Sequence, residues 1–218
     1  MSTPRRSFLS RLAALLAVGS APATLAAAVR PESAPEPAAE PAPAFWPDER
    51  WLEMIANREH KIIIEAGSVA DGLGLRRALN FIDVLNQDYQ IPDGRVGCAV
   101  GTHSGALVFI LNDAMWAKHG LGAKYGVKDA QGNAATTNTF RAGAPFTVEA
   151  LAKRGVQFLA CNRSLMRLGR ELAGATGNAN ATHAELVANV LPGVVVTPAM
   201  IVAVSRAGTR GVPYMAVP

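Results

Sequence analysis

The chain has 218 residues, of which 50% are hydrophobic and 17% charged, and its formal net charge is +4. This length is sufficient for one domain with a proper core once targeting and low-complexity segments are set aside. The positive charge includes Arg5, Arg6 and Arg11 near the start, and no basic run is interleaved with aromatic residues. These features exclude nucleic acid as an expected partner.

The first 28 residues have the order of an export signal. Arg5 and Arg6 lead into Ser7-Phe8-Leu9, a modest apolar run covers 12–18, and Ala26-Ala27-Ala28 offers a cleavage site of small residues. The apolar run is too short for a permanent membrane anchor, which needs about 20 residues. The paired arginines resemble the twin-arginine signal. We therefore expect a signal peptide at 1–28, the twin-arginine translocase as export partner, and a periplasmic or otherwise exported product.

Residues 29–47 are rich in proline, alanine and glutamate. Such a segment lacks the apolar side chains that offset the entropy of ordering, so we expect an extended linker. The folded domain then covers 48–218.

Short β-branched runs alternate with amphipathic stretches along this domain, which is typical of a parallel sheet with helices on its faces. We expect strands at 61–65, 95–100, 156–160, 194–196 and 213–217. We expect helices at 47–57, about 71–87, 104–119, 148–154, 162–173 and 184–189, a last helix opened by Pro198, and a long loop at 120–144. The pattern predicts an α/β fold, a flavodoxin-like doubly wound sheet of about five mainly parallel strands with helices on both faces. Ligands of such sheets bind beyond the carboxyl ends of the strands.

Two smaller expectations concern polar residues near helices. Asp71 is predicted to cap the 71–87 helix, with the glycines after it forming an ordinary turn. Asn112, Asp113 and Trp116 interrupt the apolar surface of the 104–119 helix. We expect them at the solvent, with a pocket or a subunit contact as the alternative.

The two cysteines, Cys98 and Cys161, make a disulfide the first hypothesis for a protein bound for an oxidising compartment. Both lie in or at the end of apolar runs, and a bridge requires Cα atoms within about 7 Å. We therefore expect two unbridged cysteines. The four histidines show no short ligand spacing with either cysteine, so no metal site is expected.

Cys161 is the sharpest candidate for chemistry. It ends the third predicted strand and precedes a helix start at Asn162, so its sulfur is expected to face unpaired backbone N–H groups and the positive end of that helix. Arg163 can add to this stabilisation of a thiolate. The alternative is a buried cysteine that acts as a small hydrophobe. His103, after the second strand, can orient a ligand or exchange protons, or it can simply cap the next helix.

Four segments together resemble the DsrE-like family of sulfur-relay domains. They are the run 97–107 (GCAVGTHSGAL), the run 112–118 (NDAMWAK), the run 151–165 (LAKRGVQFLACNRSL) and the run 191–196 (LPGVVV). The likeness covers about residues 60–218. It implies a flavodoxin-like subunit, often assembled into trimers or hexamers, in which a cysteine after the third strand accepts sulfur as a persulfide. That role carries over to Cys161 alone.

The leading hypothesis is an exported protein that handles sulfane sulfur through a persulfide at Cys161, with a sulfur donor or acceptor protein as partner. It can be a sulfurtransferase or a carrier without turnover of its own, and no cofactor beyond the persulfide sulfur is expected. Two alternatives stay open. One is a non-catalytic module that binds a small ligand or cofactor in the periplasm, and the other is an interaction subunit that is exported together with a partner enzyme.

Overall fold

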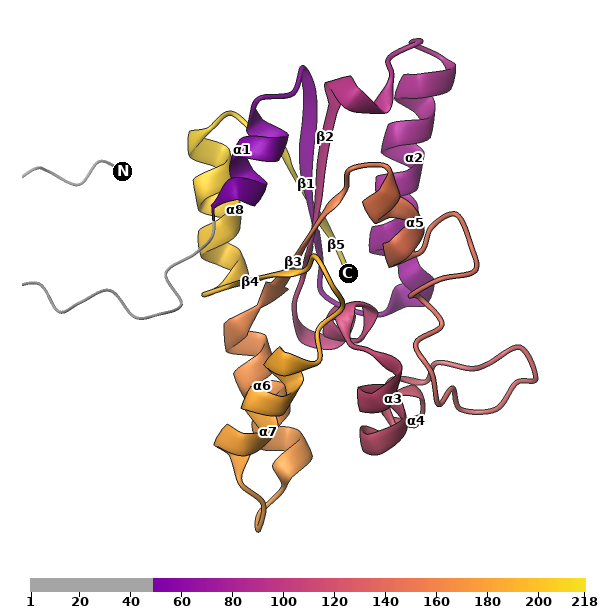
Figure 1. Cartoon of the computed structure of the whole chain (residues 1–218), viewed down its shortest axis with the longest axis vertical. Coiled ribbons are helices and arrows are strands. Elements are labelled where there is room, and N and C mark those ends of the chain that lie inside the picture. The colour runs from indigo at the N-terminus through magenta and orange to yellow at the C-terminus, as the bar shows by residue number, and fades with distance from the viewer. Residues whose placement is uncertain (1–48) are drawn as a thin grey trace, which may run out of the picture. The chain divides into compact units, whose positions relative to one another are not determined.

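The computed structural model describes residues 49–218, so the predicted signal peptide and linker lie outside the described residues. Five parallel strands form one sheet in the order β4-β3-β2-β1-β5 (Figure 1). The strands are β1 (His60–Ala66), β2 (Val96–Thr102), β3 (Gln157–Cys161), β4 (Val195–Thr197) and β5 (Tyr214–Val217). The predicted α/β, flavodoxin-like sheet is thereby confirmed.

Helices cover both faces of the sheet and its carboxyl end (Figure 1). One face carries α1 (Arg50–Ala56) and α8 (Met200–Thr209), and the other carries α2 (Leu73–Gln87) and α5 (Val148–Lys153). Beyond the carboxyl ends lie α3 (Asp113–His119), α4 (Leu121–Tyr125), α6 (Asn162–Ala173) and α7 (Ala179–Ala188). Short 3-10 turns are η1 (Ala70–Gly72), η2 (Asp93–Arg95) and η3 (Ser104–Ile110). Among the helices of residues 49–218, none has the length and apolar character needed to cross a membrane.

The sheet separates two hydrophobic cores, which explains why its central strands contain continuous apolar runs. Ile62 and Ile64 pack on the side of α2, whereas Ile63 between them packs on the side of α1 and α8. Successive side chains of a strand point to opposite faces, so a strand covered on both faces needs a continuous apolar run. The same alternation places Cys98 in the first core and Cys161 in the second. Both thiols are free, as expected, because the sheet lies between them.

The expected helix 104–119 is wrong, because the chain forms two elements there. Ser104–Ile110 is a 3-10 segment, and Leu111 is extended because it bridges to Val190. Asn112 then caps α3, its side chain accepting the Met115 N–H at 3.1 Å. Trp116, expected at the solvent, is fully buried and donates its indole N–H to the Val108 carbonyl at 3.0 Å.

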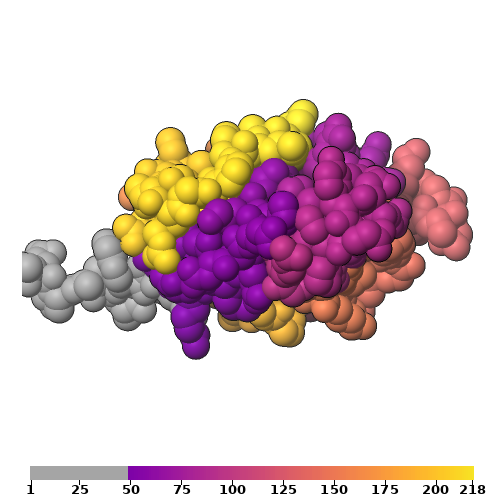
Figure 2. Space-filling model, turned by 90° about the horizontal axis from the view of Figure 1, so that it is seen from above, coloured from indigo at the N-terminus to yellow at the C-terminus, as the bar shows by residue number. Residues whose placement is uncertain are grey.

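Four other features also differ from what the sequence predicts. The 120–144 loop begins with the short helix α4, and a later stretch of this loop, salmon in Figure 2, projects from the body of the domain. Helix α7 begins at Ala179 instead of 184, because Asn178 caps it by accepting the Ala181 N–H at 3.0 Å. The last helix begins at Met200, two residues after Pro198. Asp71 is no cap, since its backbone is left-handed inside η1 and Gly72 precedes α2.

Candidate functional site

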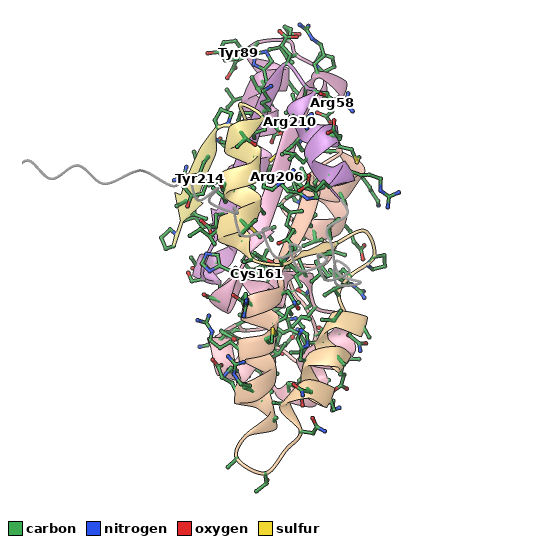
Figure 3. The ribbon with its side chains drawn as sticks, turned by 90° about the vertical axis from the view of Figure 1, so that its left-hand side faces the viewer. Arg58, Tyr89, Cys161, Arg206, Arg210 and Tyr214 are labelled. Carbon is green, nitrogen blue, oxygen red and sulfur yellow. The ribbon has the colours of Figure 1, made fainter. Side chains whose placement is uncertain are left out.

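Cys161 lies at the point where three elements meet at the carboxyl edge of the sheet (Figure 3). It is the last residue of β3, it occupies the position before the first residue of α6, and it lies beside the start of α8. Its side chain is 5% exposed and packs in the core between the sheet and helices α1 and α8. Burial of this kind keeps bulk water away from the sulfur while leaving it within reach of backbone donors.

The backbone donor to the Cys161 sulfur comes from α8. The Met200 N–H donates to Sγ at 3.4 Å, whereas at α6 the structure records no side-chain capping bond from Cys161. The expectation that α6 supplies the donors is therefore corrected. Met200 is the first residue of α8, so its N–H carries the partial positive charge of that helix terminus. The Cys161 sulfur therefore accepts a hydrogen bond from a backbone N–H at a helix terminus.

The position of Met200 depends on the neighbouring strand. A Cβ atom on Gly101 of β2 would collide with the Met200 sulfur, so the glycine lets the Met200 side chain lie against the sheet. Thr197 ends β4 in register with Cys161, and the chain needs only Pro198 and Ala199 to reach α8. The short connection therefore brings the helix terminus to the sulfur.

Arg163 and His103, the other two predicted site residues, are not in contact with the thiol. Arg163 is exposed in the first turn of α6, and the structure records no hydrogen bond or ion pair for it with any described residue. His103 follows β2 and directs its ring to Glu65 and Ser104, not to Cys161. It occupies the capping position of η3, but its ring makes no capping bond there.

A cavity of about 470 Å³ adjoins the core that contains Cys161. It is lined mainly by apolar side chains of α1, α8 and the end of β4, with one ion pair at its rim, namely by Glu49, Trp51, Thr197, Pro198, Val202, Ala203 and Arg206. Thr197 is the strand neighbour of Cys161, and both Trp51 and Ala203 belong to the same core cluster. The cavity is therefore bounded by residues of the same core as Cys161, although Cys161 itself does not line it.

Cys98, the other cysteine of the chain, differs from Cys161 in its surroundings. Its side chain is 2% exposed, and burial raises the pKa of its thiol to about 12. A thiol of this kind is not ionised at neutral pH, so Cys98 is structural. Across residues 49–218, no cluster of three or more histidine, cysteine or acidic side chains has the geometry to hold a metal ion.

The comparisons with known proteins assign neither a family nor an activity. No known protein family and no curated protein matches the chain. A similar solved structure is the protein of unknown function MTH1491 from Methanobacterium thermoautotrophicum, with 14% sequence identity and a TM-score of 0.42. The likeness covers 73% of this chain and all of that one. It is too distant to assign a function.

Ser104 and Met200 lie in strand-exit segments that the sequence indicates as candidates, but it predicts no role for either residue, and it does not indicate Glu65 at all. Glu65 is the last polar residue of β1, and its place directly before the strand exit was the signal that could have found it. Met200 acts through its backbone, which no side-chain pattern announces. Ser104 has a left-handed φ of 49°, which its sequence context does not indicate.

Proposed function

We propose that the protein accepts sulfane sulfur on Cys161 and passes it on. The Cys161 thiolate attacks the terminal sulfur of a polysulfide or of a donor protein's persulfide, the sulfur–sulfur bond of the donor breaks, and the donor leaves as a thiolate. The product is a persulfide on Cys161. A thiolate on an acceptor takes the outer sulfur by the same exchange in reverse, so no external oxidant or reductant is needed.

The observation that carries this proposal is the hydrogen bond from the Met200 N–H to the Cys161 sulfur. It gives one of the two cysteines a donor that stabilises negative charge, at the edge where ligands of parallel sheets bind. The resemblance to DsrE-like sulfur-relay domains supports the same residue.

Mass spectrometry tests the proposal on the protein without its predicted leader. We expect incubation with polysulfide to add about 32 Da, the mass of one sulfur atom, on the peptide that contains Cys161. The Cys98→Ala variant, whose remaining thiol is Cys161, gives the same adduct. The proposal fails if Cys161→Ser takes up sulfur as the unsubstituted protein does.

The cavity beside Trp51 and Val202 is the proposed route to the sulfur. We expect Val202→Trp to fill part of this space and to slow sulfur uptake at Cys161 about tenfold or more. Ile201→Trp is the matched control, because Ile201 precedes Val202 on α8, is 78% exposed and does not line the cavity. Intact mass against time measures the rate of adduct formation in both variants. Equal rates in Val202→Trp and Ile201→Trp contradict access to Cys161 through this cavity.

We propose further that the protein is exported through the twin-arginine translocase and forms a homo-oligomer, a trimer or a hexamer. Exposed side chains on the edge strand β5 support assembly, namely Tyr214 and Met215. Replacement of Arg5 and Arg6 by lysine should leave the protein in the cytoplasm, and light scattering should give the mass of three or six chains. Unchanged export points to the general secretory route.

The same cavity favours one second candidate, a module that binds a small ligand without chemistry at Cys161. Its apolar lining suits a ligand with an apolar body. Native mass spectrometry of the protein from its own periplasm separates the candidates. A bound molecule that is retained in Cys161→Ser supports the binding module.

A further inference from the structure

A network of polar side chains, at the carboxyl ends of β1 and β2 and at the start of β5, takes no part in the proposed chemistry of Cys161. The Tyr214 hydroxyl donates to the Glu65 carboxylate, and His103 Nε2 lies 3.3 Å from Glu65 Oε1. On the other side of the ring, His103 Nδ1 lies 3.0 Å from Ser104 Oγ. Arg167 of α6 donates to the same oxygen at 2.9 Å. These five side chains therefore form one network of polar contacts, and this network includes the Ser104 hydroxyl.

The chemistry of the donors and acceptors in this network indicates in which direction each hydrogen bond is donated. Arg167 can only donate, so Ser104 Oγ accepts from it, and the hydroxyl proton is free to go to His103 Nδ1. With Nδ1 as acceptor, the neutral ring carries its proton on Nε2 and donates it to Glu65. The hydrogen bond that Tyr214 donates to Glu65 raises the pKa of the Tyr214 hydroxyl. The arrangement is that of a hydroxyl, a base and an acid that orients the base.

This network of side chains lies at the point where the strand order reverses. The polypeptide runs from β1 to β2, β3 and β4 in one direction, and it then returns to form β5 on the other side of β1. Ligands of open parallel sheets bind at such a switch point. Gly67 leaves room for the base, since a Cβ there would lie 3.2 Å from the His103 ring.

Ser104 is held in an unfavourable backbone conformation. Its φ of 49° is in the left-handed region that a residue with a side chain rarely adopts. The turn is fixed from both sides, because the Gly105 N–H donates to Gly67 and the Ala106 N–H donates to His103, each at 3.0 Å. Strain of this kind persists where surrounding contacts impose it, and it is concentrated at active sites.

Ser104 also lines a cavity of about 220 Å³ whose walls carry charge. Arg167 and Lys124 contribute two positive charges, and Glu171 contributes one negative charge. Glu171 lies 3.3 Å from the Lys124 ammonium and 3.9 Å from the Arg167 guanidinium. The remaining positive charge favours a small ligand that carries a negative charge.

We propose that Ser104 is a nucleophile that hydrolyses small acyl esters bearing a carboxylate. Ser104 Oγ bonds to the carbonyl carbon, its proton passes to His103 Nδ1, and the carbonyl electrons move to the oxygen, where Arg167 stabilises the charge. The intermediate collapses, the carbon–oxygen bond of the alcohol breaks, and the alcohol leaves with the proton from Nδ1. Water attacks the acylated serine in the same way, giving the free acid and restoring Ser104. Glu65 acts through His103 and is a positioning residue.

A fluorophosphonate probe tests this proposal, because it forms a bond to an activated serine and releases fluoride. We expect one adduct on the peptide that contains Ser104, none in Ser104→Ala, and labelling at least about 10²-fold slower in His103→Gln. Ser68→Ala is the matched control, since Ser68 lies close by after β1 but contributes neither to the network nor to the lining of the cavity. Circular dichroism checks that each variant is folded.

Two outcomes overturn the proposal, namely no adduct at Ser104 or equal labelling of His103→Gln and the unsubstituted protein. Hydrolysis of p-nitrophenyl succinate gives a second measurement. Glu65→Gln should lower kcat and leave KM unchanged, whereas a purely structural role would change both. Labelling of Ser104 that persists in Cys161→Ser shows that this site is independent of sulfur chemistry. The outcome for the Ser104 proposal is therefore distinguishable from the outcome for the proposed function of Cys161.

Discussion

Replacement of Gly97 by alanine should destabilise the domain by about 3 kcal/mol, one of the largest effects expected from a single methyl group in this chain. A Cβ at this position of β2 would lie 2.9 Å from the Ile55 Cα and closer still to the Ile55 carbonyl oxygen. Both are backbone atoms of α1, so no side-chain rotation relieves the collision. Thermal unfolding followed by circular dichroism should show a midpoint lowered by roughly 6–12 °C.

Gly94→Ala is the matched control for this substitution. Gly94 lies three residues earlier, and a Cβ there meets no atom within 4 Å. Its effect on the free energy of unfolding should stay within about 0.5 kcal/mol. If Gly97→Ala is as stable as Gly94→Ala, α1 does not pack on β2 as described.

The second large effect concerns the reactivity of Cys98 in the Cys161→Ser variant, where Cys98 is the remaining thiol. A pKa of about 12 leaves about one thiol in 10⁴ ionised at pH 8. Alkylation by iodoacetamide should therefore be about 10³-fold slower in the folded protein than after unfolding, where the ordinary pKa of about 8.5 applies. Intact mass against time measures both rates.

The pH dependence of this reaction follows from the same raised pKa. Because the thiolate is the reacting form, the rate in the folded protein should rise about tenfold per pH unit from pH 7 to 10 without a plateau. The unfolded chain should instead approach a plateau above about pH 8.5. A plateau near that pH in the folded protein shows that Cys98 is not buried as described.

The middle of the sheet was predictable because β2 and β3 are buried on both faces. Each expected strand agrees with the observed one within two residues, and α6 matches at both ends, since Cys161 ends a mainly apolar run and glycine follows Ala173. The errors arose where a local cap or a long-range contact decides the structure. Asn178 starts α7 earlier than its apolar pattern indicates, and the bridge from Leu111 to Val190 interrupts a segment that is apolar enough for a helix.

The site was predictable only in part. The place of Cys161 at a strand end follows from the sequence, but its backbone donor does not, because Met200 reaches the sulfur through the pairing of β4 with β3. In the same way, His103 was a candidate from its position after β2. Its partners Glu65 and Tyr214 come from strands that are distant in sequence and adjacent in the sheet.

Release of bound sulfur by cyanide is the most direct test of the central claim, that Cys161 carries sulfane sulfur. Cyanide takes the outer sulfur of a persulfide as thiocyanate and leaves the thiolate. After loading with polysulfide and removal of the excess, the unsubstituted protein and Cys98→Ala should each yield about one thiocyanate per chain, and Cys161→Ser should yield none. Equal yields from Cys161→Ser and the unsubstituted protein would contradict the claim.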